Sequence, residues 1–145
     1  MQHFQFHQID LQTSMSSGKI LVYDVLRKKP ILLTPEEEVR QKLIHYLLKF
    51  KQVPAGLIAV ERGLKINGMM KRFDILIYNT SGKPYLAIEC KAPAVPLTQA
   101  TLQQLATYNL YLKAEFLMVS NGLEHKISQV NFETREIKFL DDLPF

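Results

Sequence analysis

Residues 73–91 read FDILIYNTSGKPYLAIECK, two apolar runs joined by a short polar segment. Both runs, 73–78 and 85–90, are rich in β-branched and aromatic residues, which favour extended backbone. The segment between them contains Asn-Thr-Ser-Gly at 79–82, and such residues are typical of turns. We therefore expect two neighbouring antiparallel strands here, paired as a hairpin.

The alternation of side chains along a strand decides which residues of this hairpin meet. Glu89 and Lys91 point to the same face of the second strand, and Asp74 shares a face with Arg72 in the first. If the strands are neighbours, the carboxylates of Asp74 and Glu89 converge, and Lys91 lies one step beyond Glu89. The hairpin therefore predicts a compact cluster of two acids and one base.

Two close carboxylates repel each other, and each favours protonation unless a cation lies between them. Mg²⁺ is a hard cation that accepts one or two carboxylates together with waters and phosphate oxygens. A lysine beside the metal can orient or deprotonate water and offset charge on a phosphate. We therefore expect Asp74, Glu89 and Lys91 to carry the hydrolysis of a phosphodiester, with Mg²⁺ or Mn²⁺ as the cofactor.

Two helices are expected to flank these strands. Thr34 can cap the first helix, Pro35 suits its first turn, and three acids at 36–38 lie at the positive end of its dipole. Apolar residues at helical spacing extend this helix to near Gln52. A second helix is expected over residues 98–112. Further strands are predicted within residues 19–33, 57–60 and 116–119.

The resulting order of helix, three strands, helix and strand predicts an α/β fold, with a mixed sheet flanked by helices. The chain has 145 residues and is 47% hydrophobic, which suits one domain with a well-formed core. Residues 1–18 are polar and are expected to form an arm. Residues 19–145 are expected to form a single domain.

Composition narrows the class of protein. The 18 Lys and Arg residues against 14 Asp and Glu give a charge of +4, which permits a polyanionic partner without requiring one. Cys90 is the single cysteine, so no intrachain disulfide can form. No secretory signal, membrane span or phosphate-binding loop of an ATPase motor is recognisable. We expect a cytoplasmic protein that does not contact membranes.

Asp74, 14 intervening residues and the sequence Glu89-x-Lys91 form an ordered pattern that further motifs surround. These motifs are Thr34-Pro35-Glu36-Glu37 with Val39-Arg40-Gln41, Lys71-Arg72-Phe73-Asp74-Ile75, Pro84, Ile88-Glu89-Cys90-Lys91-Ala92-Pro93, Gln104-x-x-x-Tyr108 and Ser120-Asn121-Gly122. The set resembles the PD-(D/E)XK nuclease superfamily. More narrowly, it resembles the N-terminal nuclease domain of type I restriction enzyme R subunits, over roughly residues 23–122. One departure is Phe73, where the superfamily has a proline.

The resemblance implies a restriction-endonuclease-like αβββαβ core and a metal-dependent DNA endonuclease of restriction or repair type. It implies that Asp74 and Glu89 bind the metal, with the main-chain carbonyl of Cys90 as a third ligand, and that Lys91 is catalytic. DNA is the implied partner. A motor or another subunit of a restriction system and a second copy of the chain are further candidate partners.

An acid on the first helix usually assists the metal or its water in this superfamily. Glu36, Glu37 and Glu38 are the candidates here. We favour Glu37 as a catalytic residue, because Glu36 falls in line with apolar helix positions and is expected to lean towards the core. Gln104, Tyr108 and Arg72 are expected to bind DNA or to support the site.

Other interpretations of the same residues remain open. Glu89 and Lys91 alone could be a surface ion pair worth less than about 1 kcal/mol, and the acids at 36–38 could serve only the helix dipole. The chain could be a non-enzymatic DNA-binding or assembly module of the same fold, or a nuclease that acts on RNA. The presence of all three residues, Asp74, Glu89 and Lys91, argues against an inactive module.

Overall fold

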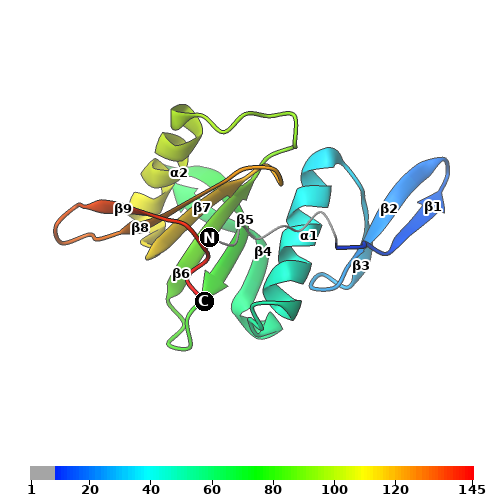
Figure 1. The fold of residues 1–145 in the computed structure, drawn as a ribbon, viewed down its shortest axis with the longest axis horizontal. Coiled ribbons are helices and arrows are strands. Elements are labelled where there is room, and N and C mark those ends of the chain that lie inside the picture. Colours follow the sequence, from blue (N-terminus) through cyan, green and yellow to red (C-terminus); the bar gives the residue numbers. More distant parts are fainter. Residues whose placement is uncertain (1–8) are drawn as a thin grey trace.

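The computed structural model describes residues 9–145, so residues 1–8 of the predicted polar arm lie outside the described part. Residues 9–145 contain two helices, one short 3₁₀ helix and nine strands (Figure 1). Their bounds are β1 Thr13–Ser16, β2 Lys19–Asp24, β3 Lys29–Leu32, α1 Pro35–Lys49, η1 Ala55–Leu57, β4 Ile58–Ile66, β5 Met69–Tyr78, β6 Pro84–Cys90, α2 Gln99–Leu112, β7 Phe116–Ser120, β8 His125–Val130 and β9 Ile137–Leu140.

The strands of residues 9–145 form two sheets. The first has the order β1-β2-β3 and is antiparallel, and the second has the order β4-β5-β6-β7-β8-β9. Within the larger sheet only β6 and β7 are parallel, because α2 carries the chain across between them. The predicted mixed sheet flanked by helices is confirmed, and its predicted order appears as α1, β4, β5, β6, α2 and β7.

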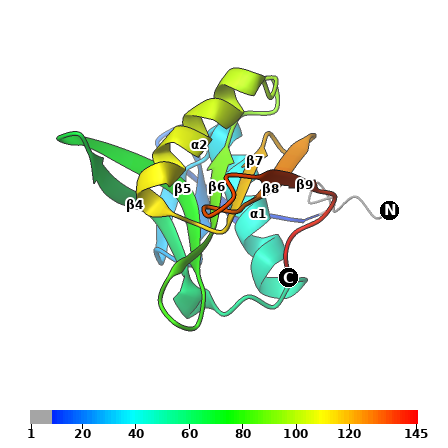
Figure 2. The same cartoon turned by 90° about the vertical axis from the view of Figure 1, so that its left-hand side faces the viewer.

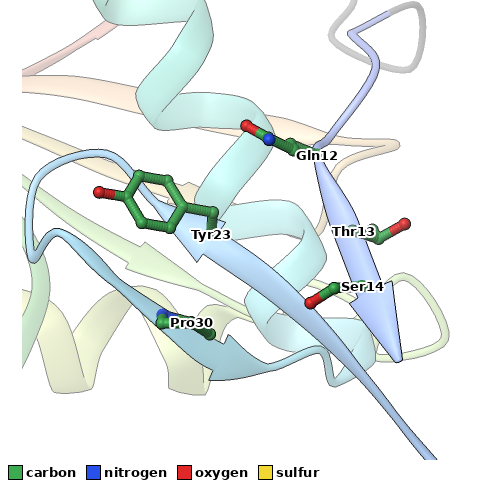
Figure 3. A pocket seen from close by; sticks show the side chains of 5 residues that line it. All are labelled: Gln12, Thr13, Ser14, Tyr23 and Pro30. Carbon is green, nitrogen blue, oxygen red and sulfur yellow. The ribbon is translucent and has the colours of Figure 1, made fainter. Parts of the chain in front are cut away.

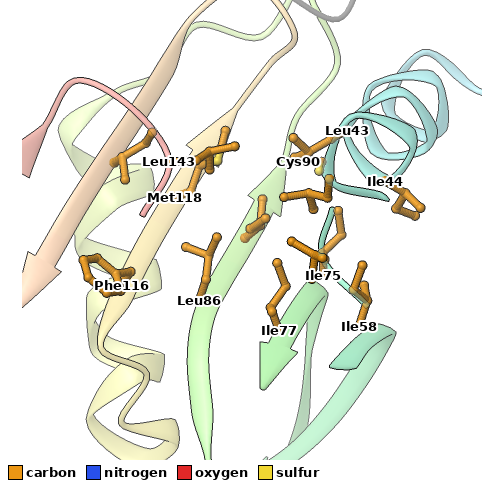
Figure 4. Close-up of a cluster of buried hydrophobic side chains, with 14 of the residues drawn as sticks. Leu43, Ile44, Ile58, Ile75, Ile77, Leu86, Cys90, Phe116, Met118 and Leu143 are labelled. Carbon is orange, nitrogen blue, oxygen red and sulfur yellow. The ribbon is translucent and has the colours of Figure 1, made fainter. Parts of the chain in front are cut away.

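The two helices cover opposite faces of the larger sheet, and each face has its own buried cluster. The α1 face joins apolar residues of α1 to alternate residues of β5, β6 and β7 (Figure 4), among them Leu43, Ile44, Leu47, Ile75, Ile77, Leu86, Ile88 and Met118. The α2 face joins α2 to the intervening residues of the same strands, among them Leu76, Ala87, Leu105, Leu117 and Val119. Because the central strands are covered on both sides, nearly every position along them is apolar.

Helix α1 begins as the sequence predicts. The hydroxyl of Thr34 accepts a hydrogen bond from the N–H of Glu37 at 3.0 Å, and Pro35 occupies the first turn. The predicted end near Gln52 is too late, since the helix ends at Lys49. Gln52 has a φ of 55°, and this left-handed residue lets the N–H of Val53 turn back to the carbonyl of Leu47 at 3.0 Å.

Strands β5 and β6 form the predicted antiparallel hairpin. Their register pairs Ile75 with Ile88 and Leu76 with Ala87. The side chain of Asn79 closes the turn by accepting hydrogen bonds from the N–H groups of Ser81 at 2.9 Å and Lys83 at 3.0 Å. The hairpin therefore has the register that brings the acids of its two strands to the same end.

Several elements lie beyond the predicted core. Residues 13–16 of the predicted arm form β1, which pairs with β2, and the three-stranded sheet lies beside α1 (Figure 1). At the other edge, β8 and β9 extend the larger sheet. Neither helix in residues 9–145 has the length and apolar character needed to cross a membrane.

The connection from α2 to β7 depends on Asn109, and this gives a prediction about stability. Its buried amide accepts a hydrogen bond from the N–H of Ala114 at 2.8 Å and donates one to the carbonyl of Ala114 at 3.0 Å. Asn109→Ala leaves both buried groups of Ala114 unsatisfied, so we expect a loss of about 2 kcal/mol in the free energy of unfolding. Urea denaturation measures this loss. Gln103→Ala, at an exposed position of the same helix, should change stability by less than about 0.5 kcal/mol. Equal losses in the two variants would contradict the assignment.

Candidate active site at the end of the central hairpin

Asp74 lies where the hydrogen-bonded ladders on both sides of β5 are interrupted. The register with β4 skips Glu61 and Asp74, and the register with β6 ends at Ile75 and Ile88. Glu61 has a φ of 54°, a conformation that non-glycine residues rarely adopt in a strand. In the gap towards β6, Oδ2 of Asp74 accepts the N–H of Cys90 at 2.8 Å. The carboxylate thus takes the place of a main-chain acceptor for the N–H of Cys90.

Glu89 and Lys91 lie on the neighbouring strand end. The main-chain N–H of Lys91 donates to the carbonyl of Ser120 at 2.8 Å, which fixes this segment against β7. The Nζ atom of Lys91 is 3.6 Å from Oε1 of Glu89, and the carboxyl of Glu89 interacts directly with that of Asp74. The structure therefore brings Asp74, Glu89 and Lys91 together.

The two carboxyls perturb each other. Burial, followed by the charge of Asp74, raises the pKa of Glu89 to about 8. Burial also raises the pKa of Asp74, although the N–H of Cys90 and the guanidinium of Arg40 oppose this effect. Because Asp74 has two donors on its oxygens, the proton that the pair retains at neutral pH belongs on Glu89.

A small pocket of about 150 Å³ opens between β6 and α2, next to this pair. Its lining residues are Arg72, Glu89, Lys91, Thr101, Gln104, Leu105 and Tyr108. Within it the amide of Gln104 donates to the hydroxyl of Tyr108 at 3.0 Å. The structure therefore brings Gln104, Tyr108 and Arg72 to the same pocket as Glu89 and Lys91.

The acids of α1 are arranged differently from our expectation. Glu36 does not lean towards the core but is exposed, and it is Glu37 that is buried. Partial desolvation of its carboxyl, followed by the charge of Asp74, raises the pKa of Glu36, and the charge of Glu36 in turn acts on Glu89. The argument that favoured Glu37 over Glu36 is therefore wrong, because the first turn rotates Glu37 into an internal ion network and leaves Glu36 beside the carboxyl pair.

Arg40 is the centre of that network and was given no role by the sequence interpretation. Its Nε and Nη2 atoms bind the carboxylate of Glu37 at 2.6 and 2.9 Å. Its Nη1 atom binds Oδ1 of Asp74 at 3.1 Å and lies 3.4 Å from Glu61. One guanidinium therefore connects α1, β4 and β5 at the position of Asp74.

Arg27, in the turn from β2 to β3, extends the network to the three-stranded sheet. It binds Asp24 at 2.6 Å, Glu37 at 3.0 Å and Glu61 at 3.1 Å. Gln41 of α1 completes the link by donating to Asp24 at 2.9 Å. The three-stranded sheet is therefore attached to α1 by charged hydrogen bonds.

One signal in the sequence could have revealed part of this network. Glu37 and Arg40 are three residues apart, a spacing at which helical side chains form ion pairs. Arg40 also follows the apolar Val39 in the sequence, and both residues are buried. Burying a guanidinium without a partner would cost free energy. The partners from distant strands, Asp24 and Glu61, carry no such local signal.

The donor set at the carboxyl pair is small. Across residues 9–145, no three side chains of His, Cys, Asp or Glu are grouped so that they could hold a metal together. Asp74 and Glu89 are two carboxyls that cannot both ionise at low cost, and a divalent cation between them would remove that cost. A pair of this kind suits a hard cation that keeps waters among its ligands, so the residues fit Mg²⁺ or Mn²⁺.

The three-stranded sheet has a hollow of its own, of about 240 Å³ (Figure 3). It is lined by Gln12, Thr13, Ser14, Tyr23 and Pro30. None of these side chains is a carboxylate, so the hollow lacks the ligands that a hard cation prefers. The chemical groups of interest are concentrated at the end of the β5–β6 hairpin.

Taken together, the fold and the site define a mixed α/β domain with a partly buried acidic pair beside a lysine. The family model described as "Type I restriction enzyme R protein N terminus" matches residues 35–144. The chain therefore belongs to the family of type I restriction enzyme R protein N termini.

A solved structure with a similar fold is a fragment of a putative HsdR subunit of a type I restriction enzyme from Vibrio vulnificus. It is 23% identical in sequence, with a TM-score of 0.48, over 77% of this chain and 24% of that one. This chain thus spans about a quarter of the length of the fragment that it matches. No protein with a curated function matches the chain.

The carboxyl pair predicts how stability depends on pH. A carboxyl whose pKa is raised on folding stabilises the protein below its unfolded pKa, near 4.5, and that stability is lost as the pH rises through about 8. In the presence of a chelator, the free energy of unfolding should therefore fall between pH 5 and pH 9. The size of the fall should be on the order of 4 kcal/mol, because the pKa of Glu89 lies about three units above pH 5 and each unit corresponds to about 1.4 kcal/mol.

Urea denaturation at pH 5, 7 and 9 measures this dependence. Glu89→Gln should flatten it and should stabilise the metal-free protein at pH 9. Glu133→Gln, at an exposed loop position, is the matched control and should leave the dependence unchanged. If Glu89→Gln kept the full pH dependence, Glu89 would not hold the shared proton.

Proposed function

We propose that this chain is a metal-dependent DNA endonuclease domain of a restriction system, and that it hydrolyses DNA phosphodiesters at Asp74, Glu89 and Lys91. One observation carries the proposal: two partly buried carboxyls meet at one strand end beside the amine of Lys91, where burial raises the pKa of Glu89 to about 8. Membership of the family of R protein N termini supports the restriction context.

Mg²⁺ or Mn²⁺ would be held by Asp74, Glu89 and the main-chain carbonyl of Cys90. Extended backbone directs the N–H and the carbonyl of one residue to the same neighbouring strand, and the N–H of Cys90 points to Asp74. The surrounding charges also favour a cation, since six carboxyls meet four cationic side chains. These groups are Asp24, Glu36, Glu37, Glu61, Asp74 and Glu89 with Arg27, Arg40, Arg72 and Lys91. When bound, such a metal polarises a phosphoryl oxygen and lowers the pKa of a bound water.

The side chains of the pocket have separate roles in this proposal. Lys91 orients the attacking water or donates to the phosphate, because its amine is partly exposed next to Glu89. Glu36, and not the earlier choice Glu37, is the acid of α1 that assists the water, since its charge acts on Glu89. Glu37 supports the site through Arg40.

Gln104, Tyr108 and Arg72 complete the proposed site on the side of α2. Arg72 lies in the pocket with Glu89, where its guanidinium would bind a phosphate of the substrate. The hydrogen bond between Gln104 and Tyr108 presents one amide and one ring to the same space. These groups would hold the DNA backbone and leave the reacting phosphate to Lys91.

A catalytically inactive assembly module is the second candidate, and one observation favours it. Both oxygens of Asp74 already have donors, Arg40 on Oδ1 and the N–H of Cys90 on Oδ2. If Asp74 could not bind a metal while keeping these contacts, the site would serve only stability. Metal titration separates the two candidates.

The proposal predicts that metal binding and cleavage can be separated by mutation. By calorimetry, wild-type protein should bind Mn²⁺, and Asp74→Asn should abolish the signal because a ligand charge is lost. Lys91→Ala should retain most Mn²⁺ binding but reduce plasmid cleavage at least about 100-fold, because it removes a proton-transfer or charge-stabilising group.

Lys83→Ala is the control for Lys91→Ala, since Lys83 is exposed in the turn at the far end of the same strand. It should change neither Mn²⁺ binding nor cleavage. Equal Mn²⁺ binding by wild type and Asp74→Asn would exclude Asp74 as a ligand. Cleavage by Lys91→Ala at the wild-type rate would leave Lys91 as a surface charge.

Partners are a further part of the proposal. The charge of +4 offers few phosphate contacts, and each contact contributes to affinity by counterion release. The protein alone should therefore nick DNA slowly, with little sequence selectivity, and should lose activity near physiological salt. A motor, another subunit of a restriction system or a second copy of the chain would supply the missing affinity.

A nicking time course at low and near-physiological salt, with and without excess protein, checks this expectation. Fast, site-specific double-strand cutting by dilute protein at physiological salt would contradict it, since the chain would then carry its own recognition surface.

A further inference from the structure

Residues 62–72 form the outer part of the β4–β5 hairpin, beyond the point where the ladder skips Asp74. The base of this ribbon contacts α2, and Figure 2 shows its tip projecting away from the body of the domain. At about 3.3 Å per residue, the five residues from Asp74 to Met69 reach about 17 Å from the acidic pair. The ribbon is therefore long enough to follow a substrate away from the site.

The charges of the ribbon are all positive. Arg62, Lys65, Lys71 and Arg72 are its four ionisable residues. Among the ion pairs of residues 9–145 none involves these four, whereas the adjoining Glu61 is already bound by Arg27. The ribbon thus presents four cations whose charge no carboxylate of the described chain neutralises.

These cations lie on both faces of the ribbon. The register pairs Gly63 with Arg72 and Leu64 with Lys71, and paired residues share a face. Alternation therefore places Arg62 and Lys71 on one face, and Lys65 and Arg72 on the other. A flat polyanionic surface would meet only one of these faces, but a groove with phosphates along both walls would meet both.

The base of the ribbon joins the pocket of the proposed site. Arg72 lines that pocket with Glu89 and Lys91, and the Nζ atom of Lys71 lies 5.5 Å from the centre of the Tyr108 ring. A phosphate chain that enters the pocket therefore continues directly along the ribbon. The four cations without ion pairs, continuous with the pocket, therefore favour a partner that carries a chain of phosphates.

We propose that the β4–β5 ribbon is a DNA-binding arm that lies in a groove of duplex DNA next to the phosphodiester to be cut. The major groove, about 12 Å wide, admits a two-stranded β-ribbon. Arg62 and Lys71 face one wall of phosphates, and Lys65 and Arg72 face the other. This inference rests on the proposed nuclease function and adds the surface that holds the substrate beside the site.

Binding of a short duplex, measured by fluorescence anisotropy in EDTA at several salt concentrations, tests the arm apart from catalysis. Four phosphate contacts give a slope of log affinity against log salt of about −3.6, which is an affinity loss of about 150-fold between 50 and 200 mM salt. The double variant Arg62→Gln/Lys65→Gln should reduce the slope to about −1.8 and the loss to about 12-fold. Both changes leave Arg72 and the acidic pair intact.

The matched control is Lys126→Gln/Lys138→Gln, which removes two exposed cations from β8 and β9 at the opposite edge of the sheet. It should keep the wild-type slope, as should the charge-conserving variant Arg62→Lys/Lys65→Arg. Circular dichroism and Mn²⁺ binding show that the ribbon variant is folded. A single strand of the same length should bind more weakly, and its affinity should respond less to the ribbon variant.

Three outcomes would each contradict the proposed DNA-binding arm. The wild type and the ribbon variant could have equal slopes, the ribbon variant and its control could show equal reductions in slope, or the wild type could fail to bind duplex. Equal binding of single strand and duplex, with the same response to mutation, would also overturn the groove geometry. Plasmid cleavage is scored in parallel. Cleavage by wild type with unchanged slopes would leave the nuclease proposal standing without the arm.

Discussion

The guanidinium of Arg40 is the contact on which the arrangement of this domain depends. It is bound to Glu37 of its own helix and to Asp74 of β5, and it lies beside Glu61 of β4. Removing a partner from such a partly buried network is costly because the remaining charges are left without compensation. Helix α1 is consequently fixed against the sheet in two ways. Its apolar face packs on the sheet, and Arg40 binds Asp74 and Glu61 where the ladder between β4 and β5 is interrupted.

The same network explains how the three-stranded sheet is held. Arg27 binds Asp24 of β2 in its own sheet, and it also binds Glu37 of α1 and Glu61 of β4. The exposed residues of this sheet include Met15 at 69% and Ile20 at 49%, so apolar burial contributes less here than in the main core. Charged hydrogen bonds are strong when shielded from water, and they specify the docking geometry more narrowly than apolar contact does. The sheet, α1 and the acidic pair thus share one set of charges.

The sequence predicted the local parts of this molecule better than the long-range ones. The hairpin of β5 and β6 followed from alternation and turn residues within 73–91, and the start of α1 followed from Thr34 and Pro35, because each signal lies within a few residues of its effect. The fold followed from the order of such elements. The expectation that Glu36 leans towards the core was wrong because helical periodicity treats a buried position as apolar, whereas here Arg27 and Arg40 make a buried Glu37 favourable. The spacing of Glu37 and Arg40 along the helix is a local signal, but Arg27 comes from the turn between β2 and β3, and no spacing along the chain predicts that contact.

The interrupted ladder at Asp74 connects this network to the chemistry of the site. A regular antiparallel sheet satisfies its main-chain groups by itself and leaves no place for a carboxylate in the plane of the strands. Here the register skips Asp74, Glu61 adopts a left-handed φ of 54°, and the N–H of Cys90 is satisfied by the Asp74 side chain. Such a conformation costs on the order of 1 kcal/mol or more and persists only where the surroundings impose it, which the ion pairs of Glu61 with Arg27 and Arg40 do. The skipped pair lies between β4 and β5. On the other side of β5, the register that pairs Ile75 with Ile88 places Asp74 opposite Glu89, and Lys91 lies next to Glu89.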